Sequence, residues 1–227
     1  MKATHEHEWE ASPGLPSALP AGEHVVWQGA PDWRSLAVHA FHVRKIAWYF
    51  AFMLALQALN LTAPEGGAGW IALAAVAWKP LLVAASLYAL ALALLLGTAW
   101  LSAHSTLYTL TNKRVVMRIG IVLTLTFNLP YKRIAGASLK SYPQGLGDIA
   151  LALYPEDRIG WAHLWPHQRA WHINQPQPTL RCLVGCAQVG EQLLALWRAE
   201  RAGESLHLGE VASHSATPTH PSHGLMA

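Results

Sequence analysis

The sequence predicts a membrane-anchored protein: an α-helical membrane hairpin precedes a cytoplasmic, mainly-β barrel or sandwich that ends in a helix. Three observations carry this prediction. They are two uncharged apolar runs of 18 and 21 residues, a series of short β-prone runs between polar turns, and a final amphipathic stretch. Charged residues make up 13% of the 227, about half the share usual in soluble domains. The composition is therefore too apolar for a wholly soluble domain and too polar for a wholly embedded one.

The two apolar runs predict the membrane helices. Ile46–Ala63 and Leu81–Leu101 are each long enough to cross ~30 Å of hydrocarbon, so we expect transmembrane helices over 46–63 and 80–101. The polar, turn-rich residues after 63 place 64–79 in a periplasmic connection. Within it, the apolar run 70–78 is either an interfacial helix or part of a third crossing.

Charge asymmetry predicts the orientation of these helices. Arg44 and Lys45 precede the first helix, and Lys113 and Arg114 follow the second, whereas the connection carries one Glu and one Lys. Basic residues mark the cytoplasmic side, so both flanks face the cytoplasm and the number of crossings is even. We therefore expect a multi-pass protein of the inner (cytoplasmic or intracytoplasmic) membrane with two crossings, with three as the alternative.

The remaining chain predicts a β domain over 104–202, preceded by a cytoplasmic segment over 19–45. The amphipathic stretch Ala187–Ala202 predicts a helix that plugs the β structure. Polar composition predicts disordered tails over 1–18, which lacks the apolar core of a signal peptide, and over 203–227. The expected strands are Thr106–Leu110, Val115–Ile119, 121–129, Ile134–Leu139 and Ile149–Leu153, with further strands near Ala162–Leu164 and Trp171–Ile173.

Three clusters are candidates for binding. The stretch WAHLWPHQRAWH combines the aromatic and arginine side chains that are enriched in protein–protein hot spots, with local packing as the alternative. The stretch FHVRK is either a second contact for a partner or the positive flank of a membrane helix. The tip Lys113-Arg114 contacts lipid headgroups or a partner, or is a solvated turn. The candidate partner-binding residues are Trp161, His163, Trp165, Arg169, Trp171, His42, Arg44 and Lys45.

Other functional classes have little support. The net charge of +3 is small and scattered, so we expect no nucleic-acid binding. We find no phosphate-binding glycine loop and no nucleophile elbow, and we expect neither catalytic residues nor a cofactor. His163 and His167 have the spacing of helical metal ligands, but Pro166 between them disfavours a continuous helix, and we expect no metal site. Cys182 and Cys186 are expected to be buried small hydrophobic residues.

Several motifs resemble known families. The segments YTLTNKRVVMRIG, NLPYKRIAGASL and GDIALAL, with GEHVVWQGAPDW upstream, resemble the bacterial pleckstrin-homology (PH) type of membrane protein. This resemblance implies a PH-like fold for the β domain and does not imply phosphoinositide binding. Segments 19–50 and 161–183 resemble the PuhB family of photosynthetic complex assembly proteins from purple phototrophic bacteria.

The second resemblance implies a function. Members of the PuhB family assist assembly of the reaction centre and, through it, the core light-harvesting complex, and they are not enzymes. The implied partners are reaction-centre subunits or an assembly intermediate, at the membrane, with a homodimer as a further option. The alternative is a general bacterial PH-like membrane protein that binds anionic lipid.

Overall fold

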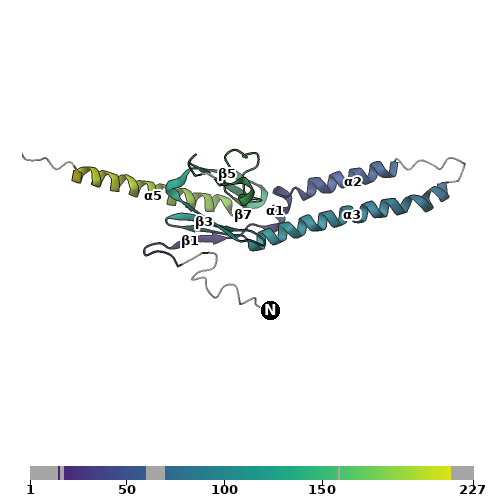
Figure 1. Ribbon diagram of the computed structural model, residues 1–227, viewed down its shortest axis with the longest axis horizontal. Coiled ribbons are helices and arrows are strands. Elements are labelled where there is room, and N and C mark those ends of the chain that lie inside the picture. The colour runs from purple at the N-terminus through teal and green to yellow at the C-terminus, as the bar shows by residue number, and fades with distance from the viewer. Residues whose placement is uncertain (1–14, 16–17, 60–69, 158, 216–227) are drawn as a thin grey trace, which may run out of the picture.

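The computed structural model describes residue 15 and residues 18–59, 70–157 and 159–215. Two long helices project from one end of a two-sheet domain, and a third helix runs along the domain and beyond its other end (Figure 1). Predictions that concern 1–14, 16–17, 60–69 and 216–227, including most of the N-terminal tail and part of the connection, lie outside the described residues. The helices are α1 (Trp33–His39), α2 (Val43–Leu59), α3 (Trp70–Ser105), α4 (Trp161–Leu164) and α5 (Cys186–Ser215).

Helix α3 is longer than the sequence predicts. It has 36 residues, which is about 54 Å of helix, and it runs through Pro80 without a break. Residues 70–79, expected in the connection, are therefore the first turns of the same helix and not a separate interfacial segment. Proline removes one backbone hydrogen bond, and the alanine- and leucine-rich sequence on both sides supplies enough helix propensity to continue past it.

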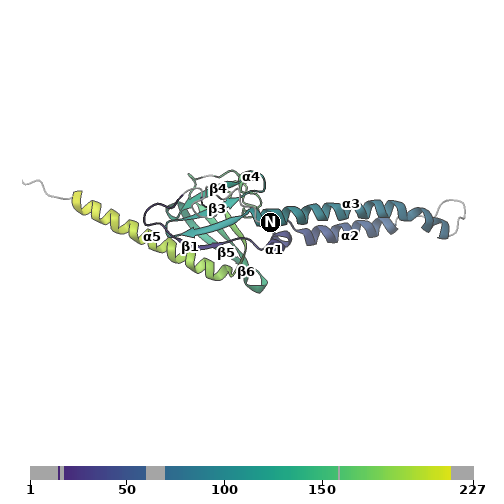
Figure 2. The same cartoon turned by 90° about the horizontal axis from the view of Figure 1, so that it is seen from below.

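One of these helices is long and apolar enough to cross a membrane: α3, over residues 78–105, on the criteria of length and composition and among the described residues. Helix α2 has 17 described residues, fewer than the roughly 20 that a spanning helix usually needs. The two helices lie side by side in both views (Figures 1 and 2). Phe50 of α2 stacks on Tyr88 of α3 with ring centroids 4.5 Å apart.

The first sheet joins one strand from before the helices to three from after them. It is antiparallel, and its order is β1-β2-β3-β4. The prediction of strands in 106–129 is confirmed, although 121–124 form the loop before β4. Strand β1 was missed because its pairing with β2 joins residues about 80 positions apart. The strands are β1 (Val25–Gly29), β2 (Leu107–Thr111), β3 (Arg114–Ile119) and β4 (Leu125–Pro130).

The second sheet is antiparallel with the order β5-β6-β7. The strand expected near 162–164 is wrong, because these residues form helix α4. Residues 171–173 form a turn and irregular chain outside any strand. Strand β7 was not predicted. The strands are β5 (Ile134–Ser141), β6 (Leu146–Leu153) and β7 (Thr179–Val184).

The two sheets share one core, and α5 covers it. The described strands form two separate sheets, so the expectation of a closed barrel is wrong. Val189 and Leu193 of α5 are buried in the core, as the helical face predicted. The helix continues to Ser215, so 203–215 are helical where a tail was expected; this segment contains no proline. The core residues include Tyr108, Leu110, Val115, Met117, Leu129, Ile149, Leu151, Leu180 and Leu183.

A smaller core fixes the helices to the sheets. Asp32 caps the N-terminus of helix α1, and its Oδ2 accepts a hydrogen bond from the Ser35 backbone N–H at 2.8 Å. Leu36 and Phe41 pack with Ala99 and Ala103 of α3 and with Cys182 of β7. We call the end of the domain that contacts α1 and the last turn of α3 the helix-proximal end, and the opposite end the distal end. Because β2 starts two residues after α3 ends, the β2–β3 turn lies at the distal end and the β3–β4 loop returns to the helix-proximal end.

Candidate functional site

The most densely bonded polar group of the helix-proximal end surrounds His167. This imidazole is fully buried between the last turns of α3, the start of β2 and the segment after α4. Its Nδ1 lies 2.6 Å from the Tyr108 hydroxyl, and its Nε2 lies 3.0 Å from Thr106 Oγ1 and 3.3 Å from Ser102 Oγ. One side chain therefore connects the α3–β2 junction to a segment 60 residues further along the chain.

The hydrogen-bond donors around His167 fix its tautomer. Thr106 donates its hydroxyl proton to the Ser102 carbonyl at 2.7 Å, so Thr106 Oγ1 must accept from the imidazole. The proton of His167 is therefore on Nε2, and Nδ1 accepts from the Tyr108 hydroxyl. The Tyr108 oxygen in turn accepts from the Arg181 backbone N–H at 3.2 Å. The hydroxyls of Thr106 and Tyr108 therefore each have a defined donor and acceptor role with a neutral imidazole.

Burial keeps the network uncharged. It lowers the pKa of His167 to about 3, and the nearby Arg181 guanidinium acts in the same direction. Burial also raises the pKa of the Tyr108 hydroxyl well above its usual range. His167 is therefore neutral at physiological pH. Both of its ring nitrogens are occupied by hydrogen bonds, so it has no free lone pair for a metal.

Backbone bonds hold the 164–179 segment against the second sheet. Thr179 N–H donates to the His167 carbonyl at 2.9 Å, and Arg169 N–H donates to the Gln177 carbonyl at 3.0 Å. Arg181 Nη2 donates to the Gln168 carbonyl at 2.7 Å. These contacts give the exposed side chains of the segment a fixed base.

The same segment exposes large apolar side chains to solvent. Trp165 is 52% exposed and Trp161 44%, while Trp171 is 95% exposed and Ile173 64%. Trp165 lies edge-on to Phe41, with ring centroids 5.4 Å apart. Exposed tryptophans on a rigid base are the side chains that most often anchor a protein partner. We call Trp161, Trp165, Trp171 and Ile173 the aromatic surface.

The structure brings two of the sequence-predicted clusters together. Phe41 directly precedes His42, and Arg44 and Lys45 follow at the exposed start of α2, so the contact between Trp165 and Phe41 joins the basic cluster to the aromatic surface. Of the remaining predicted residues, His163 is exposed on α4. Arg169 is engaged at its Nη1, which donates to Ser138 Oγ at 3.2 Å and to Gln177 Oε1 at 3.0 Å. Arg169 therefore positions the segment rather than offering a free cation.

A second polar cluster at this end was not predicted. Asp148 is buried, and its Oδ2 accepts from the Tyr142 hydroxyl at 2.7 Å, while its Oδ1 accepts from Cys182 N–H at 2.8 Å. His39 of α1 stacks on Tyr142 with ring centroids 3.9 Å apart, and burial lowers the pKa of His39. The cluster ties α1 to the second sheet. The sequence signal was an aspartate directly before the apolar strand IALAL, where a charge needs a partner.

Lys113 and Arg114 lie at the distal end. Arg114 donates from Nε and Nη2 to the two carboxylate oxygens of Glu23, at 2.7 and 2.9 Å, and Lys113 Nζ lies 2.9 Å from Glu200 Oε2. Both cations are paired with acids, and the length of β2 separates them from the end of α3. The geometry thus gives no support to a contact of this tip with headgroups around α3.

The Glu23–Arg114 pair is expected to stabilise the fold. Burial opposes ionisation of Glu23, but hydrogen bonds from Arg114 and Thr111 outweigh it and lower the pKa of this carboxyl. Glu23→Gln is expected to reduce the free energy of unfolding by about 1–2 kcal/mol at pH 7. A lowered folded pKa means that the contribution is complete above the unfolded pKa, near 4.3, and is lost as the pH falls through the folded value.

Thermal unfolding in detergent, followed by circular dichroism at pH 7 and pH 3.5, measures this difference. The matched control is Glu200→Gln, which removes the acid from the more exposed pair with Lys113 and is expected to cost under about 1 kcal/mol. Equal losses in the two variants at pH 7 would contradict the assignment.

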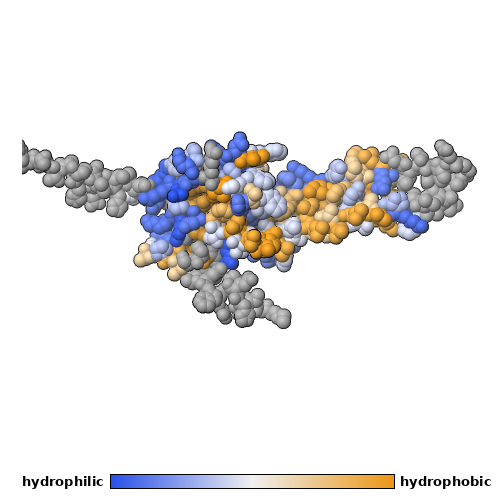
Figure 3. All heavy atoms as spheres, viewed as in Figure 1, coloured by the Kyte–Doolittle hydropathy of each residue, from blue (hydrophilic) through white to orange (hydrophobic). Residues whose placement is uncertain are grey.

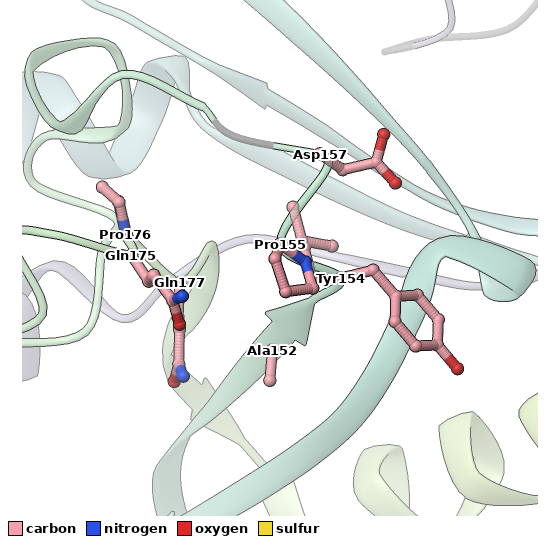
Figure 4. Close-up of a pocket in the computed structure, with 8 residues that line it drawn as sticks. Ala152, Tyr154, Pro155, Asp157, Gln175, Pro176 and Gln177 are labelled. Carbon is pink, nitrogen blue, oxygen red and sulfur yellow. The ribbon is translucent and has the colours of Figure 1, made fainter.

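The described residues offer little room for small-molecule chemistry. They contain no group of three or more His, Cys, Asp or Glu side chains placed to hold a metal ion. Figure 4 shows a cavity of about 50 Å³ between the end of β6 and the 175–177 segment, lined by Pro155, Gln175, Pro176 and Gln177 among others. Two larger hollows lie beside Asn128 and Ile159, about 190 Å³, and between Glu23, Arg114 and Glu200, about 260 Å³. Ligand pockets usually measure about 300–1,000 Å³, so all three are smaller than a typical metabolite site.

The fold is that of a mainly-β, PH-like domain with a C-terminal helix and one candidate membrane-spanning helix, an arrangement consistent with membrane association. Residues 49–181 match the family model described as the bacterial PH domain, and the chain belongs to that family. It is also 37% identical over 190 residues to a Rhodobacter capsulatus protein described as an uncharacterized 23.7 kDa protein in the puhA 5′ region. That match covers 83% of this chain and 86% of the relative.

This chain also has a weak similarity to a solved structure. The crystal structure of a DUF1696 family protein with a pleckstrin-homology domain from Shewanella loihica PV-4 is 12% identical to this chain. The match covers 40% of this chain and 71% of that chain, with a TM-score of 0.28. A TM-score at this level carries no argument about the present fold.

Proposed function

We propose that this protein is an inner-membrane assembly factor for the bacterial photosynthetic reaction centre and its core light-harvesting complex. It acts by binding reaction-centre subunits or an assembly intermediate, without bond chemistry of its own. The observation that carries the proposal is the aromatic surface, which is exposed, contacts Phe41 through Trp165 and is held by the segment that contains the buried His167.

The relative from Rhodobacter capsulatus supports the photosynthetic setting. Its description places its gene in the puhA 5′ region, and the match extends over most of both chains. The segments that resemble the PuhB family, 19–50 and 161–183, contain strand β1, helix α1, the FHVRK cluster and the aromatic surface. The resemblance and the exposed surface thus coincide in the structure.

The helices supply the anchor. In this proposal α3 crosses the inner membrane and α2 crosses beside it, with the β domain in the cytoplasm. The basic side chains of Arg44 and Lys45 at the start of α2 fit the cytoplasmic boundary. Exposed apolar residues on both helices, including Trp48, Phe52, Leu87, Leu90 and Leu94, fit contact with lipid.

Deletion of the gene in a phototrophic host tests the proposal. Reaction-centre absorbance in membranes is expected to fall, and the intact gene supplied on a plasmid is expected to restore it. A plasmid copy with Trp165→Ala and Trp171→Ala is the critical comparison. It is expected to accumulate in membranes at the normal level without restoring the absorbance. An unchanged reaction-centre yield and assembly rate in the deletion strain would overturn the proposal.

A further inference from the structure

We propose that the β3–β4 loop inserts its apolar tip into the surface of the lipid bilayer, beside the point where α3 leaves it. The tip consists of Ile121, Val122 and Leu123. This inference rests on the membrane anchoring in the proposed function. It adds a second, peripheral attachment that holds the β domain against the membrane.

The tip is apolar and exposed. Val122 is 90% exposed, Leu123 80% and Ile121 41%, and the three are consecutive in the chain. Tight turns between strands in water usually carry Gly, Asn, Asp or Ser, because polar groups there lose nothing by exposure. An uncharged run of three branched aliphatic side chains is therefore an unusual choice for a solvated turn.

The shape of the loop is fixed by its backbone. Gly120 has φ +122°, a conformation that side chains with a Cβ rarely adopt. A Cβ at this position would lie 2.0 Å from the Leu123 carbonyl oxygen, so the chain closes tightly on itself. The three aliphatic side chains consequently project from a compact turn and do not depend on a long mobile segment.

Strand register places the tip beside α3. Leu107, two residues after the end of α3, pairs with Arg118, and Ile119 pairs with Leu125 across the loop. The loop therefore extends past the start of β2, by about two residues or roughly 7 Å, at the end of the sheet where α3 enters, and α3 contacts β3. In the last turns of α3, Trp100 and Leu101 are 46% and 44% exposed. Figure 3 shows strongly apolar side chains gathered where the domain meets the helices.

Lipid is the occupant that this position favours. If α3 crosses the membrane, the bilayer surface must lie near its last turns, and Trp100 is of the residue type that concentrates at that depth. A short apolar segment buried about 5–10 Å at the boundary between headgroups and acyl chains is stabilised by its apolar area. The loop contains no charge that would have to be desolvated, and Arg44 and Lys45 at the start of α2 suit an anionic headgroup layer.

The test uses the full chain in liposomes with one introduced cysteine labelled by an environment-sensitive fluorophore. The native thiols Cys182 and Cys186 are buried, and the unsubstituted protein measures their background labelling. The probe positions are Val122→Cys at the tip, Leu90→Cys on α3 as the anchor control, and Glu156→Cys at the distal end as the aqueous control. Lipids carrying a doxyl group on the acyl chain quench probes that contact the bilayer.

We expect doxyl lipid to reduce the fluorescence at positions 122 and 90 by roughly twofold or more and to leave position 156 unchanged. If position 90 is quenched but position 122 is no more quenched than position 156, the proposed insertion of the tip is wrong and the α3 anchor stands. Absence of quenching at 90 would overturn the anchor and the insertion together. A probe at 122 that is shielded from aqueous iodide but not quenched by doxyl lipid would show that protein covers the tip, which also overturns the proposal.

Discussion

Replacing His167 with alanine is expected to lower the free energy of unfolding by about 3 kcal/mol. The substitution removes the acceptor of the Tyr108 hydroxyl and the donor to Thr106, and both groups are buried where no other partner replaces it. It also leaves a cavity in the junction between α3 and β2. Thermal unfolding of the full chain in detergent at pH 7.5, followed by circular dichroism, measures the loss.

The control for this prediction is His163→Ala. His163 precedes His167 by four residues and is exposed on α4, so its loss is expected to change the free energy of unfolding by less than about 0.5 kcal/mol. Similar stabilities for the His167 variant and the unsubstituted protein would contradict the buried network. His167→Gln retains one donor and one acceptor and is expected to recover part of the stability.

The same residue predicts a dependence on pH. The pKa of His167 is about 3 in the fold and near 6.5 in an unfolded chain, so the unfolded state binds the proton first as the pH falls. Its contribution to stability is complete above about pH 6.5 and declines between pH 6.5 and 3, by at most about 1.4 kcal/mol per pH unit. The stability difference between the native chain and His167→Gln is therefore expected to shrink over this range.

Substitution of Trp171 by alanine is expected to have the largest effect on binding. Truncating an aromatic hot-spot residue typically costs about 2 kcal/mol or more, so the amount of reaction-centre polypeptides that co-purify with the tagged protein is expected to fall by about tenfold or more. Trp171 is 95% exposed, and the melting temperature is expected to stay unchanged. The measurement is quantitative mass spectrometry of affinity-purified complexes from phototrophically grown cells.

Tyr154→Ala is the control for the binding experiment. Tyr154 is an exposed aromatic residue after β6, at the distal end, so its loss tests whether any exposed ring on the domain contributes. It is expected to leave the co-purified polypeptides unchanged. Retention of the same polypeptides by Trp171→Ala, at the native level, would exclude the aromatic surface as the point of attachment.

Local patterns identified the elements whose signals are local. The hairpin β2–β3 follows from two β-prone runs around the turn TNKR, and the buried face of α5 follows from helical spacing. Strands β1 and β7 pair with partners distant in the chain or beyond an irregular segment, and their pairing carries no local signal. The extension of α3 was missed because residues 70–79 were assigned to the connection, whereas apolar helix formers flank Pro80 on both sides and continue one helix.

Part of the site was predictable for the same reason. Tryptophans and basic residues indicate a candidate binding segment by composition alone, so Trp161, Trp165 and Trp171 could be predicted as candidates, and the structure shows that all three are exposed. Composition does not say which members of WAHLWPHQRAWH face inward. His167 is buried and Trp171 is exposed because backbone pairing with 177–179 orients the segment, and that pairing exists only in three dimensions. The joining of FHVRK to Trp165 likewise depends on the packing of α1 against α3.

Only Thr106 separates α3 from β2, and its hydroxyl is tied both to Ser102 and to His167. The connection is therefore rigid, so the helix and the domain move together. If α3 crosses the membrane as proposed, a change of its tilt in a thinner or thicker bilayer would rotate the domain with it. The lipid composition of the membrane would then set the height and angle of the exposed tryptophans above the bilayer.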